Sequence, residues 1–448
     1  KAALISSSIV LNVRLLKIFC LIGMFSFAAS SHAQVKIKDF QPFKFRVSET
    51  FIPTDSPIIA QEIDEVIQSQ KNMNESDYQE MNYWNASYPS YRWHQIMMEI
   101  SRAHKGHKNG ARVVILHLSI FDALAEVWRH KIQHEIAAPY LQNSDVQKLG
   151  RDRFYSSFLC EWSAAAGAAR EVIGYYFPDR KSYLDSLTTH FIEARLKTGL
   201  QLPSDIERGL AIGKNIAIQY LAYAKTDRTD LIWEGKVPNV DTLWTGNPGK
   251  WDPMKRQWRP LTLASADQFR PSPPPTDWTA DMNELRRFNA DKKTSEIAWK
   301  WKSAPVWDNL LERKILEYDL NPFEAAFSCA LFHTSRFDGI IAAWDGKYHY
   351  WGIRPFQYDP EFKPILIQTP NFPGYPAGHT TVAGSLATAL SFLFPQDEQL
   401  FMILAEECSE SRFEGGVHFR TDNEVGLNVG YKVGTQVINT FKERVAGN

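Results

Sequence analysis

Residues 411–422 read SRFEGGVHFRTD and place a fixed cation, two glycines, an imidazole and a carboxylate within twelve residues. Arg412 can bind two oxyanion oxygens at once through its planar guanidinium. His418 and Asp422 are four residues apart, so a helix would put them on one face. The carboxylate could then accept from one ring nitrogen and leave the lone pair of the other free to bind. The block predicts an anion-binding segment, in which the glycines at 415–416 let the backbone approach the anion.

A second block lies just upstream, where FPGYPAGH precedes a helical apolar pattern. Pro376 leads into Ala377, Gly378 and His379, and the helix is expected to start there. The first N–H groups of a helix have no partner inside the helix, and a glycine lets a ligand come close to them. The block therefore predicts an anion cradle with His379 at its mouth.

The third block, WDGKYHYWGIRP at residues 344–355, contributes Lys347 and Arg354, seven residues apart. They are expected near the end of a helix and in the loop that follows, because Pro355 stops a helix or fixes a turn. Each block also has a simpler interpretation when it is taken alone. Two basic residues can belong to a solvated surface, a His at a helix start to a capping turn, and a His–Asp pair to a local helix contact.

The elements that must position these residues are predicted to be helical. Apolar residues recur at helical spacing from about Trp84 to the C-terminus, without convincing strand alternation or an internal sequence repeat. We expect an all-α protein, a large bundle of a dozen or so helices over residues 84–448, after a short irregular extension at 34–83. Residues 226–280, rich in Trp, Pro and Gly, interrupt the pattern. An insert of this length with five tryptophans is expected to pack over something.

Residues 1–33 have a basic start, an apolar run and small residues before Ala33, the pattern of a signal peptide cleaved after Ala33. The chain is therefore expected to be exported, to the periplasm or the medium, and no later apolar stretch is long enough to span a membrane. A net charge of −1 favours neither nucleic acid nor an anionic membrane as partner. Three widely spaced cysteines remain (Cys160, Cys329, Cys408), which indicate neither a zinc site nor a disulfide framework; one disulfide among them stays open.

Taken in order, the blocks read K-x6-R-P, P-x-G-H and S-R-x5-H-x3-D. This signature resembles the superfamily shared by vanadium-dependent haloperoxidases and type-2 phosphatidic acid phosphatases. The stretches FDALAEVW, PLTLASADQFRPSPPP and TDNEVGLNVG look like the bacterial haloperoxidase branch, so the resemblance covers most of residues 84–440.

The resemblance implies a role for each motif residue. Vanadate would be the cofactor, with its oxygens held by Lys347, Arg354, Arg412 and the N–H groups at Gly378. His418 would bind vanadium, with Asp422 orienting its ring, and His379 would be the acid–base group. Lys347 would also polarise bound hydrogen peroxide, which then oxidises a halide to hypohalous acid. Trp344 and Phe372 occupy positions that line the halide side in similar haloperoxidases.

One position departs from the family pattern, because Ala377 stands where a Ser usually precedes the Gly-His pair. A hydroxyl donor to the oxyanion is then missing. Two alternatives to the haloperoxidase stay open, an acid phosphatase with His418 as nucleophile and a catalytically weak oxyanion-binding protein. Halide preference, an organic substrate and oligomeric state are not indicated by the sequence.

Overall fold

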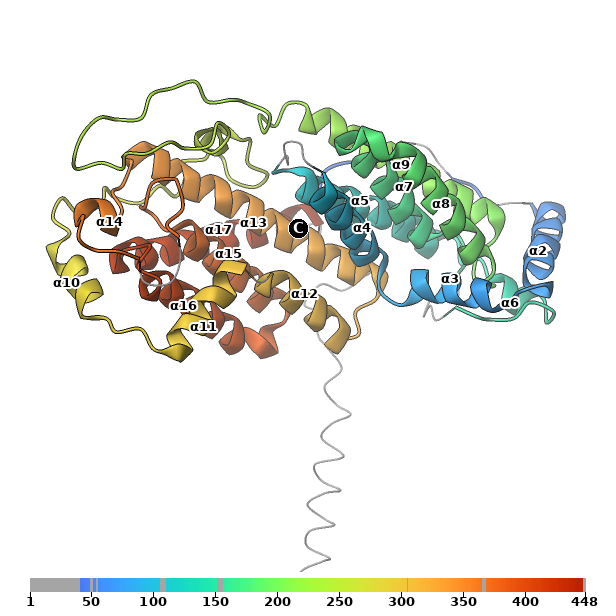
Figure 1. Cartoon of the computed structure of the whole chain (residues 1–448). Helices are drawn as coiled ribbons and strands as arrows, with labels where there is room; N and C mark the ends of the chain where they lie inside the picture. The colour runs from blue at the N-terminus through green and yellow to red at the C-terminus, as the bar shows by residue number, and fades with distance from the viewer. Residues whose placement is uncertain are drawn as a thin grey trace, which may run out of the picture.

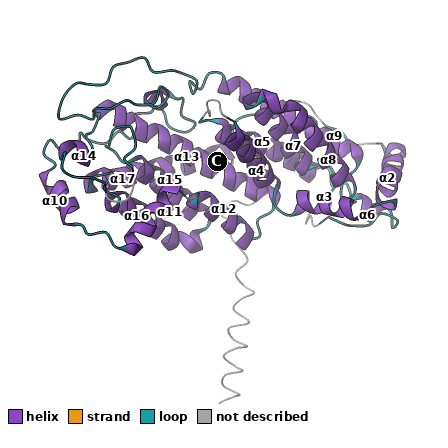
Figure 2. Cartoon of the chain, in the orientation of Figure 1, coloured by secondary structure: helices purple, strands orange, loops and turns teal. Residues whose placement is uncertain are grey.

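The computed structural model describes residues 41–48, 51–53, 55–104, 110–150, 156–303, 305–364 and 368–445. Within these ranges the regular structure is helical, with sixteen α-helices, three short 3-10 helices and two isolated β-bridges (Figure 2). The predicted all-α class is confirmed. In the same ranges, no helix combines the length and apolar character that a membrane span requires. The predicted signal peptide, with its cleavage after Ala33, lies outside the described residues.

Two bundles of four helices form the body of the molecule, side by side in Figure 1. The N-terminal bundle consists of α5 (Arg112–Gln133), α7 (Glu161–Tyr176), α8 (Lys181–Leu196) and α9 (Pro203–Ala224). The C-terminal bundle consists of α13 (Pro322–Tyr350), α15 (Gly378–Leu393), α16 (Glu398–Glu414) and α17 (Arg420–Val445). The remaining helices cover or connect these bundles: α2 (Ser56–Lys71), α3 (Glu75–Asn85), α4 (Pro89–Ala103), α6 (Pro139–Gln142), η2 (Pro178–Arg180), η3 (Pro253–Gln257), α10 (Thr279–Arg287), α11 (Lys292–Ser303), α12 (Val306–Glu317), α14 (Pro355–Tyr358) and η4 (Pro395–Asp397).

The two bundles repeat one another, which the sequence pattern alone did not reveal. Helices α7, η2, α8 and α9 each begin 217 residues before α15, η4, α16 and α17, respectively. The segment DIERGLAIG at 205–213 aligns at this offset with DNEVGLNVG at 422–430, although few other residues are identical. The repeat is therefore carried by helix lengths and by a few packing residues.

Glycines show why the same positions are kept in both bundles. A Cβ on Gly213 of α9 would lie 2.0 Å from the carbonyl oxygen of Ala164 on α7. At the equivalent place, a Cβ on Gly430 of α17 would lie 2.2 Å from the carbonyl oxygen of Thr381 on α15. Both contacts are possible only without a side chain, so each glycine lets two helices pack backbone against backbone.

The Trp/Pro-rich insert at 226–280 lies over α13, as the yellow-green loop above that helix in Figure 1. The buried carboxylate of Asp338 on α13 accepts hydrogen bonds from the backbone N–H groups of Leu261 and Thr262. Trp258 stacks on Phe337, with ring centroids 5.6 Å apart. The insert therefore buries the helix that carries Lys347.

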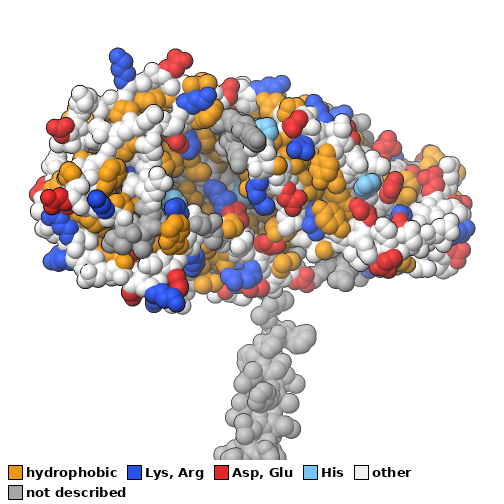
Figure 3. Space-filling model, in the orientation of Figure 1, with side chains coloured by type: hydrophobic (Ala, Val, Ile, Leu, Met, Phe, Trp, Pro, Cys, Tyr) orange, Lys and Arg blue, Asp and Glu red, His pale blue; other side chains and the backbone are white. Residues whose placement is uncertain are grey.

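The N-terminal extension is less irregular than its composition predicted, since it contains α2 and most of α3. Asn74 and Asp77 form a reciprocal capping box that starts α3. Upstream, the backbone N–H groups of Phe43 and Phe45 donate to Asp122 on α5, which fastens this segment to the N-terminal bundle. On the face shown in Figure 3, basic and acidic side chains are interspersed rather than gathered into a patch of one sign.

Candidate active site

Lys347 lies in the last turn of α13 and is fully buried. Its ammonium group donates to the carbonyl oxygens of Pro373 (2.8 Å) and Gly374 (2.7 Å) in the loop before α15. This loop and the end of α13 therefore meet around one cation, although they are more than 25 residues apart in sequence. The prediction had placed Lys347 near a helix end, and the structure agrees.

Arg354 is the N-cap residue of α14, and Pro355 occupies the first turn of that short helix. The guanidinium is fully buried. It donates to the carbonyl oxygen of Phe372 through Nε and Nη2, both at 3.0 Å, and to that of Val417 through Nη1 at 2.6 Å. Arg354 thus joins the loop before α15 to the loop before α17.

His418 and Asp422 pair as predicted, with 3.0 Å between Nδ1 and Oδ2. They do not lie on one helix, however, because α17 begins at Arg420 and His418 precedes it. Asp422 also accepts from the N–H of Phe419 at 3.1 Å, so its carboxylate caps α17 and holds the imidazole at the same time. The first turn of α17, rather than a continuous helix face, brings the two side chains together.

The second ring nitrogen of His418 has a partner that the sequence did not predict. Arg354 Nη1 lies 3.0 Å from His418 Nε2. A guanidinium only donates, so Nε2 accepts and Nδ1 carries the proton that is donated to Asp422. The lone pair expected to be free is therefore aimed at the Arg354 cation.

The predicted helix start is confirmed, because α15 begins at Gly378. No side chain caps its first N–H groups. Ala377, which is fully buried, donates its N–H to the backbone oxygen of Asp422 at 2.9 Å, so α15 and α17 start against each other. A Cβ on Gly378 would lie 3.0 Å from the Trp344 ring and 3.3 Å from Lys347 Cε. The glycine therefore lets the open helix end approach the lysine.

His379 is the second residue of α15 and its side chain is exposed. Among the described residues, its ring has no hydrogen-bond partner. Arg412, near the end of α16, is buried and donates through Nη2 to the carbonyl oxygen of Ala298 at 2.8 Å and through Nε to Ser411. In the same described part of the chain, no hydrogen bond of Arg412 Nη1 is seen.

The glycines at 415–416 form a turn. Gly415 is the C-cap residue of α16, and Gly416 adopts a left-handed backbone conformation with φ +71°. A Cβ on Gly416 would lie 3.1 Å from Phe362. The two glycines thus let the chain reverse tightly between Arg412 and His418, and their approach to an anion stays a prediction.

Charge in this site is unbalanced. Three cations, Lys347, Arg354 and Arg412, are buried in the region of the Asp422 carboxylate. Burial lowers the pKa of Arg354 to about 10, and burial together with Arg354 lowers the pKa of Lys347 well below its usual value. Burial also raises the pKa of Asp422, against the effect of the two cations. A bound anion would relieve this excess of positive charge.

The two histidines respond to the same cations. Burial, and then Arg412, Lys347 and Arg354, lower the pKa of His379 to about 4. The His379 side chain is nevertheless exposed to solvent, although many protein atoms surround its ring. Burial, and then Arg354 and Lys347, lower the pKa of His418 well below its usual value. Both imidazoles are neutral at pH 7 and can accept a proton or bind through a lone pair.

Trp344 and Phe372 form an aromatic wall beside Lys347. Their ring centroids are 5.3 Å apart, and Lys347 Nζ lies 5.2 Å from the Phe372 ring. The indole N–H of Trp344 is buried and has no hydrogen-bond partner among the described residues. The predicted halide-side residues therefore border the cationic site, and the indole N–H of Trp344 is available there as a hydrogen-bond donor.

The N-terminal bundle contains a counterpart of this arrangement that carries no histidine. Lys131 is the equivalent of Lys347 and donates to the carbonyl oxygen of Ser156 at 2.8 Å. Glu161 begins α7 where Gly378 begins α15, and its buried carboxylate lies 3.2 Å from Lys131 Nζ. Gln201 and Asp205 stand 217 residues before His418 and Asp422. Within the two described bundles, the combination of an open helix start with two histidines is therefore found in the C-terminal one.

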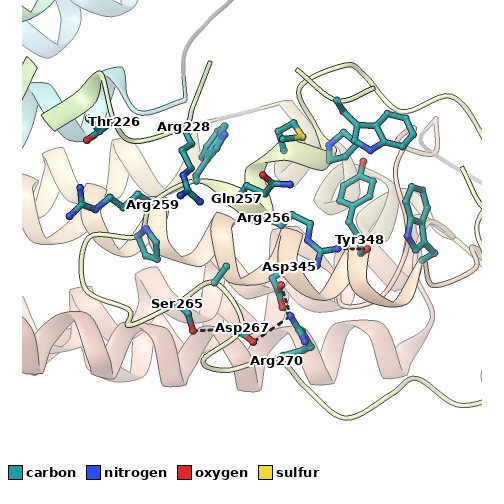
Figure 4. A pocket seen from close by; sticks show the side chains of 17 residues that line it. Thr226, Arg228, Arg256, Gln257, Arg259, Ser265, Asp267, Arg270, Asp345 and Tyr348 are labelled. Carbon is teal, nitrogen blue, oxygen red and sulfur yellow. Dashed lines mark hydrogen bonds and ion pairs between the residues drawn. The ribbon is translucent and has the colours of Figure 1, made fainter. Parts of the chain in front are cut away.

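A cavity of about 720 Å³ lies elsewhere (Figure 4). It is enclosed by the insert and by α13 residues and their neighbours, such as Asp345, Tyr348 and Trp351. None of the predicted site residues lines it. The cysteines Cys160, Cys329 and Cys408 are all free thiols, so the disulfide that the sequence left open is not formed.

Residues 326–446 match the sequence model of the PAP2 superfamily. This segment contains all three motif blocks, so the resemblance seen in the motifs is confirmed at the level of the superfamily. No curated protein matches the chain.

Three similar solved structures are bacterial enzymes. One is the first bacterial vanadium-dependent iodoperoxidase, 20% identical, with a TM-score of 0.55, covering 85% of this chain and 96% of its own. The others are apo and holo forms of a bacterial vanadium-dependent chloroperoxidase, 16% and 17% identical, with TM-scores of 0.58 and 0.57. They cover 75% of this chain in both cases, and 93% and 91% of their own. At these identities the likeness establishes a shared fold.

Proposed function

From a PAP2-superfamily segment that holds the site, and a fold shared with bacterial haloperoxidases, we propose that this chain is a vanadate-dependent haloperoxidase. The reaction oxidises a halide by two electrons, reduces hydrogen peroxide to water and consumes one proton, giving hypohalous acid. The observation that carries the proposal is the orientation of His418. Its Nδ1–H donates to Asp422, and its Nε2 lone pair faces the buried guanidinium of Arg354.

The donor set fits vanadate. Lys347, Arg354 and Arg412 carry three buried positive charges against the one carboxylate of Asp422, which suits a tetrahedral oxyanion with delocalised negative charge. The uncapped start of α15 adds N–H donors and the positive end of a helix dipole. A neutral imidazole is a good ligand for a transition metal. When bound, vanadate supplies the Lewis acid that activates hydrogen peroxide toward halide.

The protein's own residues have separate tasks in this proposal. The guanidinium groups of Arg354 and Arg412 bind and orient the oxyanion. Asp422 keeps the His418 ring in one tautomer and makes it a stronger ligand. Lys347 is fixed by two carbonyl oxygens and has one N–H left to donate toward bound oxygen atoms.

His379 is assigned the proton transfer. It is exposed, lacks a hydrogen-bond partner in the described part of the chain, and is neutral at pH 7 because its pKa is near 4. Neutral imidazole can take a proton from hydrogen peroxide and return it to the product oxygen. A bound oxyanion offsets the nearby cations, which raises the pKa of His379 toward its usual value and makes it a better base.

Trp344 and Phe372 exclude water from one side of the site in this assignment. The unpaired indole N–H of Trp344 is suited to hydrogen-bond a halide there. Chloride, bromide and iodide all remain candidates.

An acid phosphatase of the same superfamily is the second candidate. It is favoured by the PAP2 match and by the same Nε2 lone pair, which would attack phosphorus instead of binding vanadium. A protein that binds an oxyanion with little turnover is the third, because Ala377 supplies no hydroxyl.

The deciding experiment measures two activities on one vanadate-free preparation. Hydrogen peroxide-dependent oxidation of iodide, bromide and chloride is followed with and without added vanadate, and with phosphate as competitor. Hydrolysis of a phosphomonoester is followed in parallel. The His418→Ala variant controls for activity outside the site, and Gln201→Ala provides the matched change in the N-terminal bundle.

The haloperoxidase predicts halide oxidation that vanadate restores, phosphate suppresses and His418→Ala abolishes, while Gln201→Ala retains it. Phosphomonoester turnover without any effect of vanadate on halide oxidation would establish the phosphatase instead. Vanadate binding without either turnover would identify the oxyanion-binding protein.

A further inference from the structure

Three histidines outside the proposed active site lie together where the two bundles meet. His94 belongs to α4, His117 to α5 and His333 to α13, three helices that lie side by side in Figure 1. One ring nitrogen from each lies within 4.8 Å of the other two. His94 Nδ1 is 3.0 Å from His117 Nε2, and the rings of His117 and His333 stack with centroids 4.2 Å apart.

The repeat between the bundles explains part of this cluster. His117 and His333 are 216 residues apart, as are Lys131 and Lys347 on the same two helices. Equivalent positions of α5 and α13 therefore face each other across the bundle interface. His94 adds a third imidazole from a helix outside both bundles.

We propose that His94, His117 and His333 form a binding site for one divalent transition-metal cation of the Zn²⁺ type. Imidazole nitrogens bind such ions at about 2.0–2.1 Å, which puts the nitrogens of a tetrahedral site about 3.3 Å from one another. The 3.0 Å pair already lies near this separation, and 4.8 Å bounds the others. The ring of His333 has to rotate out of its stack so that its lone pair points at the same ion.

The surroundings of the rings favour a ligand. Nδ1 of His333 is buried and has no hydrogen-bond partner in the described part of the chain, an arrangement that costs free energy. A neutral imidazole is the form that coordinates metal ions.

A cavity of about 240 Å³ adjoins the cluster and gives an ion a way in. Its lining includes the carboxylates of Asp308 and Glu312 and the guanidinium groups of Arg102 and Arg336, so it lacks the strong positive charge of the proposed active site. Cys329 also lines it, but burial raises the pKa of that thiol, which disfavours the thiolate that a metal needs. The site would thus use histidines, with water in the remaining position.

Such an ion would join the two bundles, because its ligands come from α5, α13 and α4. It would stabilise the interface about 14 residues before Lys347 along α13. This inference does not depend on the proposed haloperoxidase activity.

The test titrates the untagged, vanadate-free full chain with Co²⁺, whose visible absorption reports tetrahedral coordination, and then with Zn²⁺ as competitor. We expect one Co²⁺ per chain, displaced by Zn²⁺, and a higher melting temperature with Zn²⁺. His94→Gln should weaken binding by at least about 10-fold, because it removes one of three ligands. His190→Gln, at an exposed histidine of α8, is the matched control and should bind as the parent does.

His94 is only partly buried, so its replacement is the gentlest of the three, and circular dichroism checks that the variant is folded. His333→Gln should show the same loss, whereas His418→Ala should keep Co²⁺ binding and lose vanadate. Absence of Co²⁺ and Zn²⁺ binding to the parent chain overturns the proposal, as does binding that His94→Gln and His333→Gln leave unchanged.

Discussion

Replacing Asp422 with Asn tests whether the charged partner of His418 makes the site specific for vanadate. In the parent chain, one carboxylate oxygen, Oδ2, accepts from His418 Nδ1 and from the N–H of Phe419. The amide that Asp422→Asn introduces is isosteric with the carboxylate, and its single oxygen can take the place of Oδ2 and accept both bonds. The amide NH₂ then takes the place of Oδ1, which is buried without a hydrogen-bond partner in the described part of the chain. The ring proton stays on Nδ1, but its acceptor is no longer charged, so Nε2 becomes a weaker ligand.

The size of the effect follows from the charge that is removed. A hydrogen bond to a charged group contributes about 1.5–3 kcal/mol and a neutral one about 0.5–1.5 kcal/mol, so the change should weaken vanadate binding by about 5- to 13-fold at 1.36 kcal/mol per tenfold. A second term has the opposite sign, because the variant has one negative charge fewer beside three cations. That term strengthens binding of any oxyanion. Phosphate does not need the His418 lone pair to bind, so its affinity should stay the same or rise.

The assay is a titration with vanadate that is monitored by calorimetry or tryptophan fluorescence. A parallel titration uses phosphate. The ratio of vanadate affinity to phosphate affinity should fall by about 5- to 13-fold in Asp422→Asn. Asp205→Asn is the matched control, since Asp205 is the equivalent buried aspartate of the N-terminal bundle. Equal changes for both oxyanions, or the same change in Asp205→Asn, would refute the role assigned to the lone pair.

Four other changes have definite expected outcomes. His418→Ala should abolish vanadium binding and leave a weak oxyanion site, as calorimetry would show; near-normal turnover would contradict the assignment. His379→Ala should keep vanadate binding but slow peroxide activation by roughly 10²–10⁴-fold. In the parent chain, activity should fall as pH drops through the pKa of His379, between about 4 without an anion and the usual value of about 6.5, and this step should vanish in the variant. Ala377→Ser should strengthen vanadate binding by about 1.5–3 kcal/mol at most, and an unchanged dissociation constant would mean that another donor already fills that place. Glu161→Gln should lower the free energy of unfolding by about 3–5 kcal/mol in denaturant titrations, because it leaves the buried Lys131 charge unpaired; a stability equal to the parent's would show that the pair contributes little.

The chain's residue types and spacings were enough to predict the helical class and the three motif blocks. The start of α15 depends on neighbouring residues. Pro376 restricts the backbone just before the helix, and Gly378 leaves the first turn open to close approach. The pairing of His418 with Asp422 is also local, because the first turn of α17 brings the two side chains together. The resemblance to the superfamily could be read from the same motifs, and residues 326–446 match its sequence model.

Contacts between distant segments were decided by the tertiary structure alone. Arg354 and His418 are 64 residues apart, and no periodicity of either segment indicates that the guanidinium meets the Nε2 lone pair. The sequence did not reveal the repeat of the two bundles, because most side chains differ between them. The helix lengths and a few glycine contacts recur. His94 and His333 also come together through tertiary structure alone, because they lie on different helices that the packing of α4, α5 and α13 brings close. Sequence patterns report which face of a helix is buried, whereas the partner on the other side depends on how the whole chain packs.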